Sequence, residues 1–451
     1  MVRLFSVSGL GFGDEGKGAT VDWICRNKVP QGSKPAMVIR HNGGPQCSHA
    51  VITPEGHTHL FHQFGSGTLA GASTYLDRDV IIDPVAMEAE GKSLEKKTDR
   101  EVFLDMFIHP ECMLTTMFQR LFNHAAAGMR TNTCGFGVGA TRKLYLENPA
   151  ANLTAIDLYS HAGNEFYRRL KWLRDRLLYI AYETNIDATL LRRTTVDEVY
   201  TPLMQAAEVI FKHHPPQHSL MRARVTDLYV FEGAQGMLLD QEYGFQPYTT
   251  WSDLSSHSVK QSMAYHDLAR RAEQIENWGV IRAYHTRHGD GPFPTELASS
   301  AMVDPCNPSN KYQGKFRFGR FDSVLFQYAI QSYQQALPLT GIVINHMDQY
   351  PRDEQVVESY SHYDHSQLHF RAAWTMGGFN PALHPCRETS EGIGAYLEKV
   401  KGNPNEYKVR RIAEDEFPQY VSDLSRQPVV LTGHGPTHAD KEVCTIIPVS
   451  L

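Results

Sequence analysis

Apolar residues gather along the chain in short, nearly continuous runs, separated by longer stretches with helical spacing. Runs that are β-branched or aromatic, with apolar residues on both faces, are typical of strands buried in a parallel sheet. Between residues 164 and 181, apolar residues recur every three or four positions, which predicts a helix with one apolar face. The alternation predicts an α/β protein with a large, mainly parallel central sheet flanked by helices. The predicted strands cover residues 3–8, 36–40, 79–83, 101–108, 227–232, 278–284, 341–345 and 429–433.

No internal repeat, low-complexity segment or linker divides the chain, so we expect a single domain over residues 1–451. Two polar stretches, 285–320 and 350–390, are rich in glycine, proline and histidine and are predicted to form long inserted loops. Long loops in a compact fold are more often functional than ordinary connections are.

Composition narrows the functional class only slightly. The formal net charge of -6 disfavours a dedicated nucleic-acid-binding protein. No apolar run approaches the roughly 20 residues of a membrane helix, and the start MVRLFSVSGLG lacks the features of a signal peptide. The seven cysteines are scattered and form no CxxC pair, which indicates free thiols in a reducing compartment. We therefore expect a cytoplasmic protein with no nucleic-acid or membrane partner.

Residues 9–18 read GLGFGDEGKG and lie between a predicted strand and a predicted helix. A glycine-rich turn at a helix N-terminus presents backbone N–H groups and partial positive charge, which suit phosphate, and Lys17 adds a full charge. The Ser or Thr that follows the lysine of a P-loop is missing. Asp14 would repel phosphate unless it coordinates Mg²⁺ or takes a proton from a substrate. From composition alone, a glycine turn with a solvated acidic pair is an equal alternative.

Eight sequence blocks together resemble the adenylosuccinate synthetase family, in the order that the family has them. The first is GFGDEGKG, which is similar to the family's WGDEGKGK, and the most specific are EGAQGMLLD and GPFPTEL. GPFPTEL ends the block AYHTRHGDGPFPTEL (283–297), and the other blocks are RHNGGPQCSHAVI (40–52), HQFGSGTL (62–69), TNTCGFGVGA (131–140), NHMD (345–348) and LTGHG (431–435). The resemblance implies the family's P-loop-NTPase-like fold with long inserted loops, in a divergent member.

The resemblance also implies a reaction. Family members transfer the γ-phosphoryl group of GTP to O6 of IMP and then displace it with L-aspartate, which gives adenylosuccinate for purine nucleotide biosynthesis. GTP is the co-substrate, Mg²⁺ is the metal, and the enzyme is a homodimer. Phosphoryl transfer of this kind is catalysed mainly by positioning and by stabilising charge on the migrating group.

Residues at matching positions inherit expected roles from the family. Asp14 is expected to take the N1 proton of the purine, His49 to stabilise the migrating phosphoryl group, and Gln235 to contact the purine nucleotide within the catalytic set. Asp14 and the backbone carbonyl of Ser48 are expected to hold Mg²⁺. The residues expected to bind GTP are Gly13, Asp14, Glu15, Gly16, Lys17, Gly18, Ser48, His49, Ala50, His346, Asp348, Thr432 and Gly433. Those expected to bind the purine nucleotide are Asp14, Lys17, Gln46, His49, Thr133, Cys134, Gln235, Thr250 and His288.

The chain departs from the family pattern at the substrate ends of the site. Cys134 and Phe136 replace a threonine and an arginine of the 5′-phosphate site, and the arginine that the partner subunit inserts there has no clear match. His346 replaces the lysine of the family's TKLD. The stretch 310–322 lacks the family's Thr-Thr-Gly-Arg core. Positive charge remains at Lys315, Arg317 and Arg320, the expected amino-acid-binding residues, although a solvated basic loop is the alternative.

Three functions follow from this pattern. The first is a GTP-dependent ligase that joins L-aspartate to IMP or a related hypoxanthine nucleotide. The second is a relative that uses a modified or deoxy purine nucleotide, or a different amino acid, in a nucleic-acid modification or nucleoside pathway. Retention of Asp14 favours a hypoxanthine-type acceptor, and His288 and Asp290 are positioned in the sequence to read a changed base. The third, an inactive nucleotide-binding regulator, is disfavoured because Asp14, His49 and Gln235 are all retained.

Overall fold

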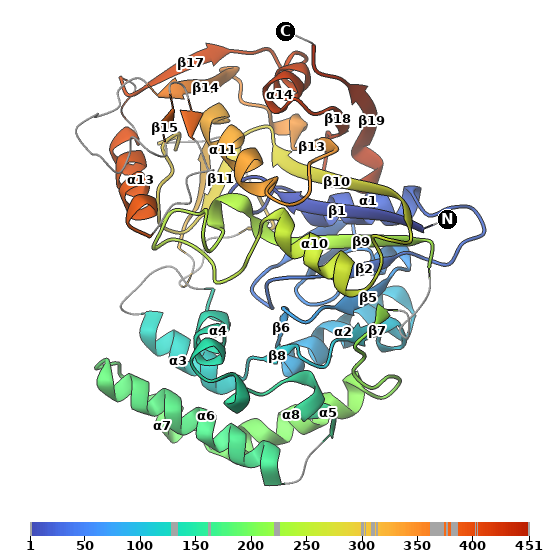
Figure 1. The fold of residues 1–451 in the computed structure, drawn as a ribbon, viewed down its shortest axis with the longest axis vertical. Helices are drawn as coiled ribbons and strands as arrows, with labels where there is room; N and C mark the ends of the chain where they lie inside the picture. The colour runs from blue at the N-terminus through green and yellow to red at the C-terminus, as the bar shows by residue number, and fades with distance from the viewer. Residues whose placement is uncertain are drawn as a thin grey trace.

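The computed structural model describes residues 2–127, 134–160, 164–220, 226–298, 302, 304–307, 312, 314–360, 374–375, 378–379, 387–401, 403 and 405–449. Its centre is a nine-stranded sheet in the order β19-β18-β13-β10-β1-β9-β2-β5-β7 (Figure 1). All neighbouring pairs are parallel except β18 with the edge strand β19. The predicted fold class is therefore confirmed. The strands are β1 (Val2–Gly9), β2 (Met37–Arg40), β5 (Ser73–Leu76), β7 (Met106–Ile108), β9 (Leu228–Gly236), β10 (Ala272–Arg282), β13 (Gly341–Asn345), β18 (Val429–Gly433) and β19 (Lys441–Ile446).

Helices cover both faces of this sheet. On one face, α1 (Lys17–Asn27) packs Val21 and Ile24 against Phe5 and Val7 of β1. On the other, α10 (Ser256–Tyr265) packs with Leu4 of β1, as the alternation of side chains along a strand requires. A third core holds α11 (Ser323–Tyr333) and α14 (Phe417–Ser425) beside β13 and β18.

A group of helices with its own apolar core lies at the bottom of Figure 1. The helix predicted over 164–181 is confirmed and runs from Asn164 to Glu183, with Phe166, Leu170, Leu173 and Leu177 buried. The group consists of α2 (Pro84–Thr98), α3 (Met117–Ala127), α4 (Val138–Glu147), α5 (Ala155–Ser160), α6 (Asn164–Glu183), α7 (Thr189–Arg193) and α8 (Val196–Ile210).

Two strand predictions are only partly right. The run 79–83 forms only β6 (Ile81–Ile82), outside the main sheet, because Asp83 caps α2 and Pro84 begins it. The run 101–108 contributes only β7, after a 3₁₀ turn at Val102–Asp105. Strands β5 and β19 were not predicted: β5 contains Ser and Thr, and β19 is an exposed antiparallel edge strand without a continuous apolar run.

Both stretches predicted to be long loops, 285–320 and 350–390, contain short strands where they are described, and residues 361–373, 376–377 and 380–386 lie outside the described residues. β11 (His285–His288) pairs with β12 (Phe316–Gly319), and β14 (Gln355–Tyr360) pairs with β17 (Tyr407–Arg411). The remaining elements are β3 (His49–Ile52), β4 (Thr58–Phe61), β8 (Met113–Leu114), β15 (Trp374–Thr375), β16 (Gly378–Phe379) and α13 (Arg387–Val400), with 3₁₀ turns at Thr68–Ala70, Pro149–Ala151, Met237–Leu239, Met347–Gln349 and His438–Asp440.

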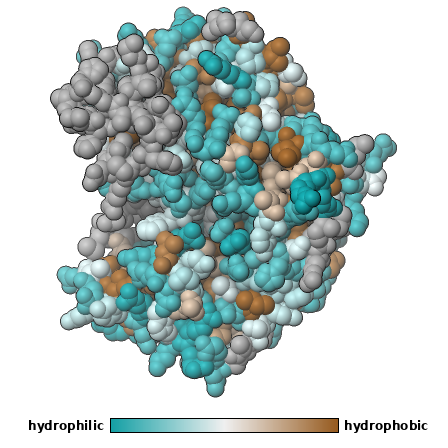
Figure 2. Space-filling view, in the orientation of Figure 1, coloured by the Kyte–Doolittle hydropathy of each residue, from teal (hydrophilic) through white to brown (hydrophobic). Residues whose placement is uncertain are grey.

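The surface in Figure 2 is mostly hydrophilic, with small and scattered hydrophobic groups. Among the described residues, no helix has the length and apolar character that crossing a bilayer demands.

Candidate functional site

The glycine-rich loop follows β1 and ends at Gly16, the N-cap of α1, so it lies at the carboxyl edge of the sheet. Glu15 is buried within it, at 3% exposure. One oxygen of Glu15 accepts hydrogen bonds from the backbone N–H groups of Gly11 (3.0 Å) and Gly13 (2.8 Å), and the other pairs with Lys17 Nζ at 2.6 Å. The alternative of a solvated acidic pair is wrong, because Glu15 is buried and its hydrogen bonds stabilise the conformation of the loop.

Asp14 adopts a left-handed backbone conformation with φ of 63° and is half-buried. Its carbonyl oxygen accepts a hydrogen bond from Nε of Arg282, at the end of β10, and the Arg282 guanidinium also pairs with Asp304 at 2.6 Å. Burial raises the pKa of the Asp14 carboxyl to about 6, against the opposing charges of Arg282 and Lys17. Such a carboxyl is suited to accept a proton near neutral pH.

His49 begins β3, and its Nδ1 lies 2.5 Å from Oε1 of Glu232 on β9. Burial lowers the pKa of His49 to about 4 against the attraction of Glu232. Burial by itself would raise the pKa of Glu232, but the interactions of its carboxylate with His49 and Arg40 outweigh this effect and lower the pKa to about 2. Neutral His49 therefore donates from Nδ1 to the ionised carboxylate. Its Nε2 is buried and has no hydrogen-bond partner among the described residues.

The His49 hairpin lies against the first turn of α1, directly after the glycine-rich loop. A β-carbon placed on Gly18 would stand 2.9 Å from Cβ of His49, so the absence of a side chain at Gly18 allows this approach. Glu232, which orients His49 and also accepts from the backbone N–H of Ser66 at 3.0 Å, was missed in the sequence. Its signal was its place at the head of the EGAQG block, but nothing local marks it as the partner of a histidine 183 residues away.

Several buried polar atoms near this edge lack partners among the described residues. They include both amide atoms of Gln46, Oε1 of Gln235 and both ring nitrogens of His41. Gln235 has a positive φ of 54°, and a β-carbon on Gly13 would lie 3.9 Å from its Cα, so it adjoins the glycine-rich loop. A buried polar group left unpaired costs roughly 1–3 kcal/mol. Orphaned amides of this kind are expected where a polar ligand binds.

Other residues assigned to the purine nucleotide are placed less tightly. Thr250 is half-buried and donates its backbone N–H to Leu239 at 2.8 Å. Cys134 is half-buried, while Thr133 lies outside the described residues. Phe136, which stands where the family has an arginine, is covered by the Arg120 guanidinium at 5.5 Å from its ring centre.

Four of the residues assigned to GTP, including the two assigned to its guanine base, lie at adjacent strand ends. Thr432 and Gly433 end β18, and His346 and Asp348 directly follow β13, its neighbour in the sheet. The ring of His346 meets Tyr284 edge-to-face at 6.1 Å, and the Asp348 residue is exposed. The structure thus brings the base-reading candidates together beside the glycine-rich loop.

The cations assigned to the amino acid are mostly engaged elsewhere. Arg317 on β12 pairs with Glu296 at 3.0 Å, and Arg320 pairs with Asp353 at 2.7 Å, whereas Lys315 is exposed.

The opposite face of β12 is aromatic. Phe316 lies 5.7 Å from the Arg282 guanidinium and 5.5 Å from His288, and Phe318 lies 6.1 Å from Tyr284. Nε2 of His288 is buried with no partner in the part of the chain that is described. The side of β12 that faces Arg282 is thus apolar where positive charge was expected.

Magnesium fits the donor set only with help from substrate. No group of three His, Cys, Asp or Glu side chains among the described residues could hold a metal ion. Mg²⁺ commonly uses one or two carboxylates together with substrate phosphates, so a site with Asp14 and the Ser48 carbonyl is compatible with that ion.

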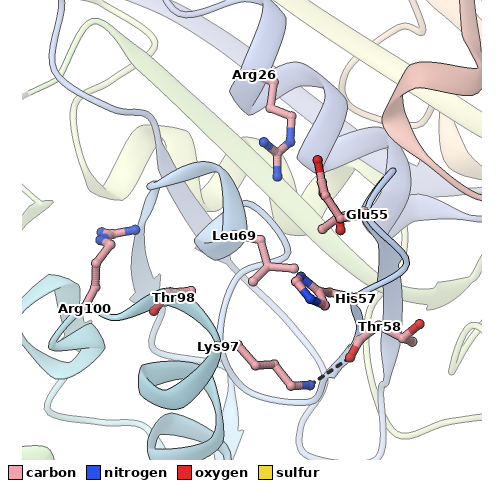
Figure 3. A pocket seen from close by; sticks show the side chains of 9 residues that line it. Arg26, Glu55, His57, Thr58, Leu69, Lys97, Thr98 and Arg100 are labelled. Carbon is pink, nitrogen blue, oxygen red and sulfur yellow. Dashed lines mark hydrogen bonds between the residues drawn. The ribbon is translucent and has the colours of Figure 1, made fainter.

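A cavity of about 250 Å³ lies away from all of these residues, between the tip of the β3–β4 hairpin and the end of α2. Figure 3 shows Arg26, Lys97 and Arg100 around it, with Lys97 Nζ donating to the Thr58 carbonyl at 2.7 Å. Arg26 pairs with Asp22 at 2.9 Å and Arg100 with Asp105 at 2.8 Å. Its main charges already have partners, and it contains none of the candidate site residues.

Several known proteins are similar to this chain in sequence or in fold. The adenylosuccinate synthetase family model matches residues 6–440. An adenylosuccinate synthetase of Thermoplasma acidophilum is 28% identical over 456 residues, covering 95% of both chains, and one of Picrophilus torridus is 27% identical over 72% of both. The fold is similar to the fully ligated adenylosuccinate synthetase of Plasmodium falciparum, with a TM-score of 0.72, 16% identity, and coverage of 98% of this chain and 99% of that one. It is also similar to the succinoaminodeoxyadenylate synthetase of cyanophage S-2L, with a TM-score of 0.55, 14% identity, and coverage of 98% and 95%.

Proposed function

This chain belongs to the adenylosuccinate synthetase family and is a GTP-dependent C–N ligase, and we propose that it joins L-aspartate to IMP, or a closely related hypoxanthine nucleotide, through a 6-phosphoryl intermediate. The observation that carries this proposal is the packing of His49, which pairs with Glu232, against Gly18 in the first turn of α1, the helix that begins where the loop holding Asp14 ends. A base and a histidine with a free Nε2 therefore adjoin one phosphate-binding turn.

In the first step, Asp14 takes the N1 proton of the purine, which makes O6 nucleophilic. O6 then attacks the γ-phosphorus of GTP and GDP leaves. Negative charge develops on the migrating group beside Nε2 of His49, and an anionic substrate there favours the protonated ring. Glu232 stabilises that cation through Nδ1, as a carboxylate does for a catalytic histidine. Lys17, paired with Glu15, lies where it can contribute positive charge to the phosphates.

In the second step, the amino group of aspartate attacks C6, and the phosphate leaves with the former O6. The amine loses a proton, and His49 is proposed to protonate the departing oxygen. Mg²⁺, held by Asp14 and the Ser48 carbonyl, would neutralise phosphate charge when bound. Among the described residues, both amide atoms of Gln46 and Oε1 of Gln235 have no partner. These two side chains are proposed to hold the purine nucleotide together with Thr133, Cys134, Thr250 and His288.

Guanine is proposed to bind beside His346, Thr432 and Gly433, with Asp348 accepting hydrogen bonds from its N1–H and N2–H₂ groups. Adenine has no matching donors on that edge. A homodimer is proposed from family membership alone, and whether a partner arginine completes the 5′-phosphate site is part of that proposal.

A second candidate is favoured by β12: the amine is an amino acid other than aspartate. Aspartate brings two carboxylates, but Arg317 and Arg320 are paired with protein carboxylates and the face toward Arg282 is aromatic. The cyanophage synthetase with the same fold was solved with dGMP and dATP, so deoxynucleotides also belong in any substrate panel.

The test is a matrix assay of phosphate release and product mass. GTP or ATP is combined with IMP, dIMP or dGMP and with each of the common amino acids. We expect product with GTP and IMP, and a GTP preference of at least about tenfold because a carboxylate facing adenine is left unpaired. Product with aspartate supports the first candidate, and product only with another amino acid supports the second. Phosphate release that occurs with ATP but not with GTP contradicts both candidates. The absence of product with every hypoxanthine nucleotide also contradicts them.

A further inference from the structure

Lys441 is a buried cation that none of the assigned roles uses. It begins the edge strand β19, lies opposite Gly433 in the antiparallel pair with β18, and is 9% exposed. Its Nζ donates a hydrogen bond to Oδ1 of Asn345, the last residue of β13.

Asn345 joins two loops. Its Nδ2 donates to the backbone carbonyls of Glu15 (2.8 Å) and Gly16 (3.3 Å) in the glycine-rich loop. Directly after it come His346, with a positive φ of 59°, and Asp348. One amide therefore fixes the phosphate-binding turn relative to the proposed base reader.

Two glycines, Gly433 and Gly16, leave room for the side chains of Lys441 and Asn345. A β-carbon on Gly433 would stand 2.8 Å from Oδ1 of Asn345 and 3.2 Å from Nζ of Lys441, and one on Gly16 would stand 2.7 Å from Nδ2 of Asn345. Glycine at both positions lets the lysine reach the asparagine and the asparagine reach the loop. The Lys441 ammonium also sets the amide orientation, because it can only donate and so must face Oδ1.

We infer that Lys441 is a positioning residue for GTP: acting through Asn345, it holds the base-reading loop in register with the phosphate loop. In the NHMD segment, His346 stands where the family has a lysine. Lys441 supplies a cation near that position from β19. This inference rests on the proposed use of GTP and adds a residue from outside the eight sequence blocks.

Burial lowers the pKa of Lys441 to about 8, against the attraction of Asp22 and Asp440. The charged groups facing it are Asp22 from α1, Asp440 from the preceding 3₁₀ turn, and His346, whose own pKa burial depresses well below its ordinary value. Lysine with a lowered pKa loses its charge as pH rises through that value. GTP affinity is therefore expected to weaken above about pH 8, while the purine-nucleotide affinity changes less.

The test measures GTP binding by calorimetry, without purine nucleotide or amine, so that turnover plays no part. Lys441→Met should raise the Kd for GTP about tenfold or more, as expected when a charged hydrogen-bond donor is lost. The Kd for IMP should stay within about twofold, and the alkaline rise in Kd for GTP should disappear. Glu442→Gln, an exposed change on the same strand, should leave both constants unchanged.

Asn345→Ala and the double variant show whether the lysine acts through the asparagine. We expect the double variant to bind GTP no more weakly than Asn345→Ala alone, since the two residues form one unit. If Lys441→Met unfolds at a lower temperature than the wild type, the binding measurements are made on Lys441→Gln, which keeps a hydrogen-bond donor without the charge. Wild-type protein that binds GTP while both lysine variants bind it equally well overturns the inference. Wild-type protein that binds no GTP overturns the proposed function and the inference with it.

Discussion

The two ends of the candidate site differ in how their polar groups are used. At the carboxyl ends of β1, β2 and β9, Nε2 of His49, the amide of Gln46 and Oε1 of Gln235 are buried without partners among the described residues. At β11 and β12, Arg317 and Arg320 already have carboxylate partners, and Phe316 and Phe318 face Arg282 and Tyr284.

The first end contains the groups proposed for the chemical steps, and the second contains those proposed to select the amine. The groups proposed to stabilise phosphoryl transfer and to hold the purine have buried polar atoms that are unpaired among the described residues, as a preorganised site requires. Of the cations expected to bind the amine's carboxylates, Arg317 and Arg320 are already in ion pairs within the protein and Lys315 is exposed, while aromatic rings occupy the face toward Arg282. The comparison predicts that changes at the first end remove turnover, whereas changes at the second alter which amine is used and how tightly.

The largest effect is expected from Asp14→Asn, which keeps the size of the side chain but cannot take the N1 proton. Loss of a general base typically costs about 10²–10⁴ in rate, so product formation should fall that far in a steady-state assay. Asp415→Asn, an exposed substitution elsewhere, is the matched control. A rate within a few-fold of wild type would show that Asp14 is not the base.

His49→Ala should come next. Removing one group that stabilises transition-state charge costs about 10²–10³ in turnover, while the Kd for GTP should change less than fivefold, as a rough bound. Glu232→Gln should give an intermediate loss, because the ring keeps a partner but loses the carboxylate that favours its charged form. Equal losses in GTP affinity and turnover would contradict the role of His49.

The pH dependence of kcat/KM tests the role of Asp14 at the first end further. The pKa of Asp14 is raised to about 6, so the carboxyl is ionised above that value and protonated below it. Only the ionised form accepts a proton, and kcat/KM for the purine nucleotide should therefore fall by about tenfold per pH unit below pH 6. A flat profile between pH 5 and 7, measured with stability checked at each pH, would exclude Asp14 as the titrating base.

The smallest effects are expected at the second end. Lys315→Ala should raise the KM for the amine by about tenfold, the lower limit for a charge-assisted hydrogen bond, because Lys315 is exposed. Arg317→Ala should move that KM less and instead lower stability by about 1 kcal/mol, since it breaks a partly buried ion pair with Glu296. A larger rise in KM for Arg317→Ala than for Lys315→Ala would reverse this assignment and place Arg317 on the substrate.

Local motifs made much of this predictable from the sequence. The GLGFGDEGKG turn, the helix over 164–181 and the buried strands other than those predicted at 79–83 and 101–108 depend on residues close in the chain, and they lie where expected. Glu232 and Lys441 were not predicted because their contacts, with His49 and Asn345, depend on how distant strands pack. The carboxylate of Glu15 was expected to face ligand or solvent, but its backbone and lysine partners turn it inward. The pairing of Arg317 with Glu296 required the β11–β12 hairpin, in a stretch that was predicted to be a loop.

Transfer of oxygen from the purine to phosphate tests the central claim most directly. IMP labelled with ¹⁸O at O6 is incubated with GTP, the accepted amine and the enzyme, and the released phosphate is analysed by mass spectrometry. If Asp14 and His49 activate O6 for attack on the γ-phosphoryl group, each product molecule formed should yield one phosphate carrying a single ¹⁸O. Product formation with unlabelled phosphate would contradict a 6-phosphoryl intermediate and, with it, the roles assigned to both residues.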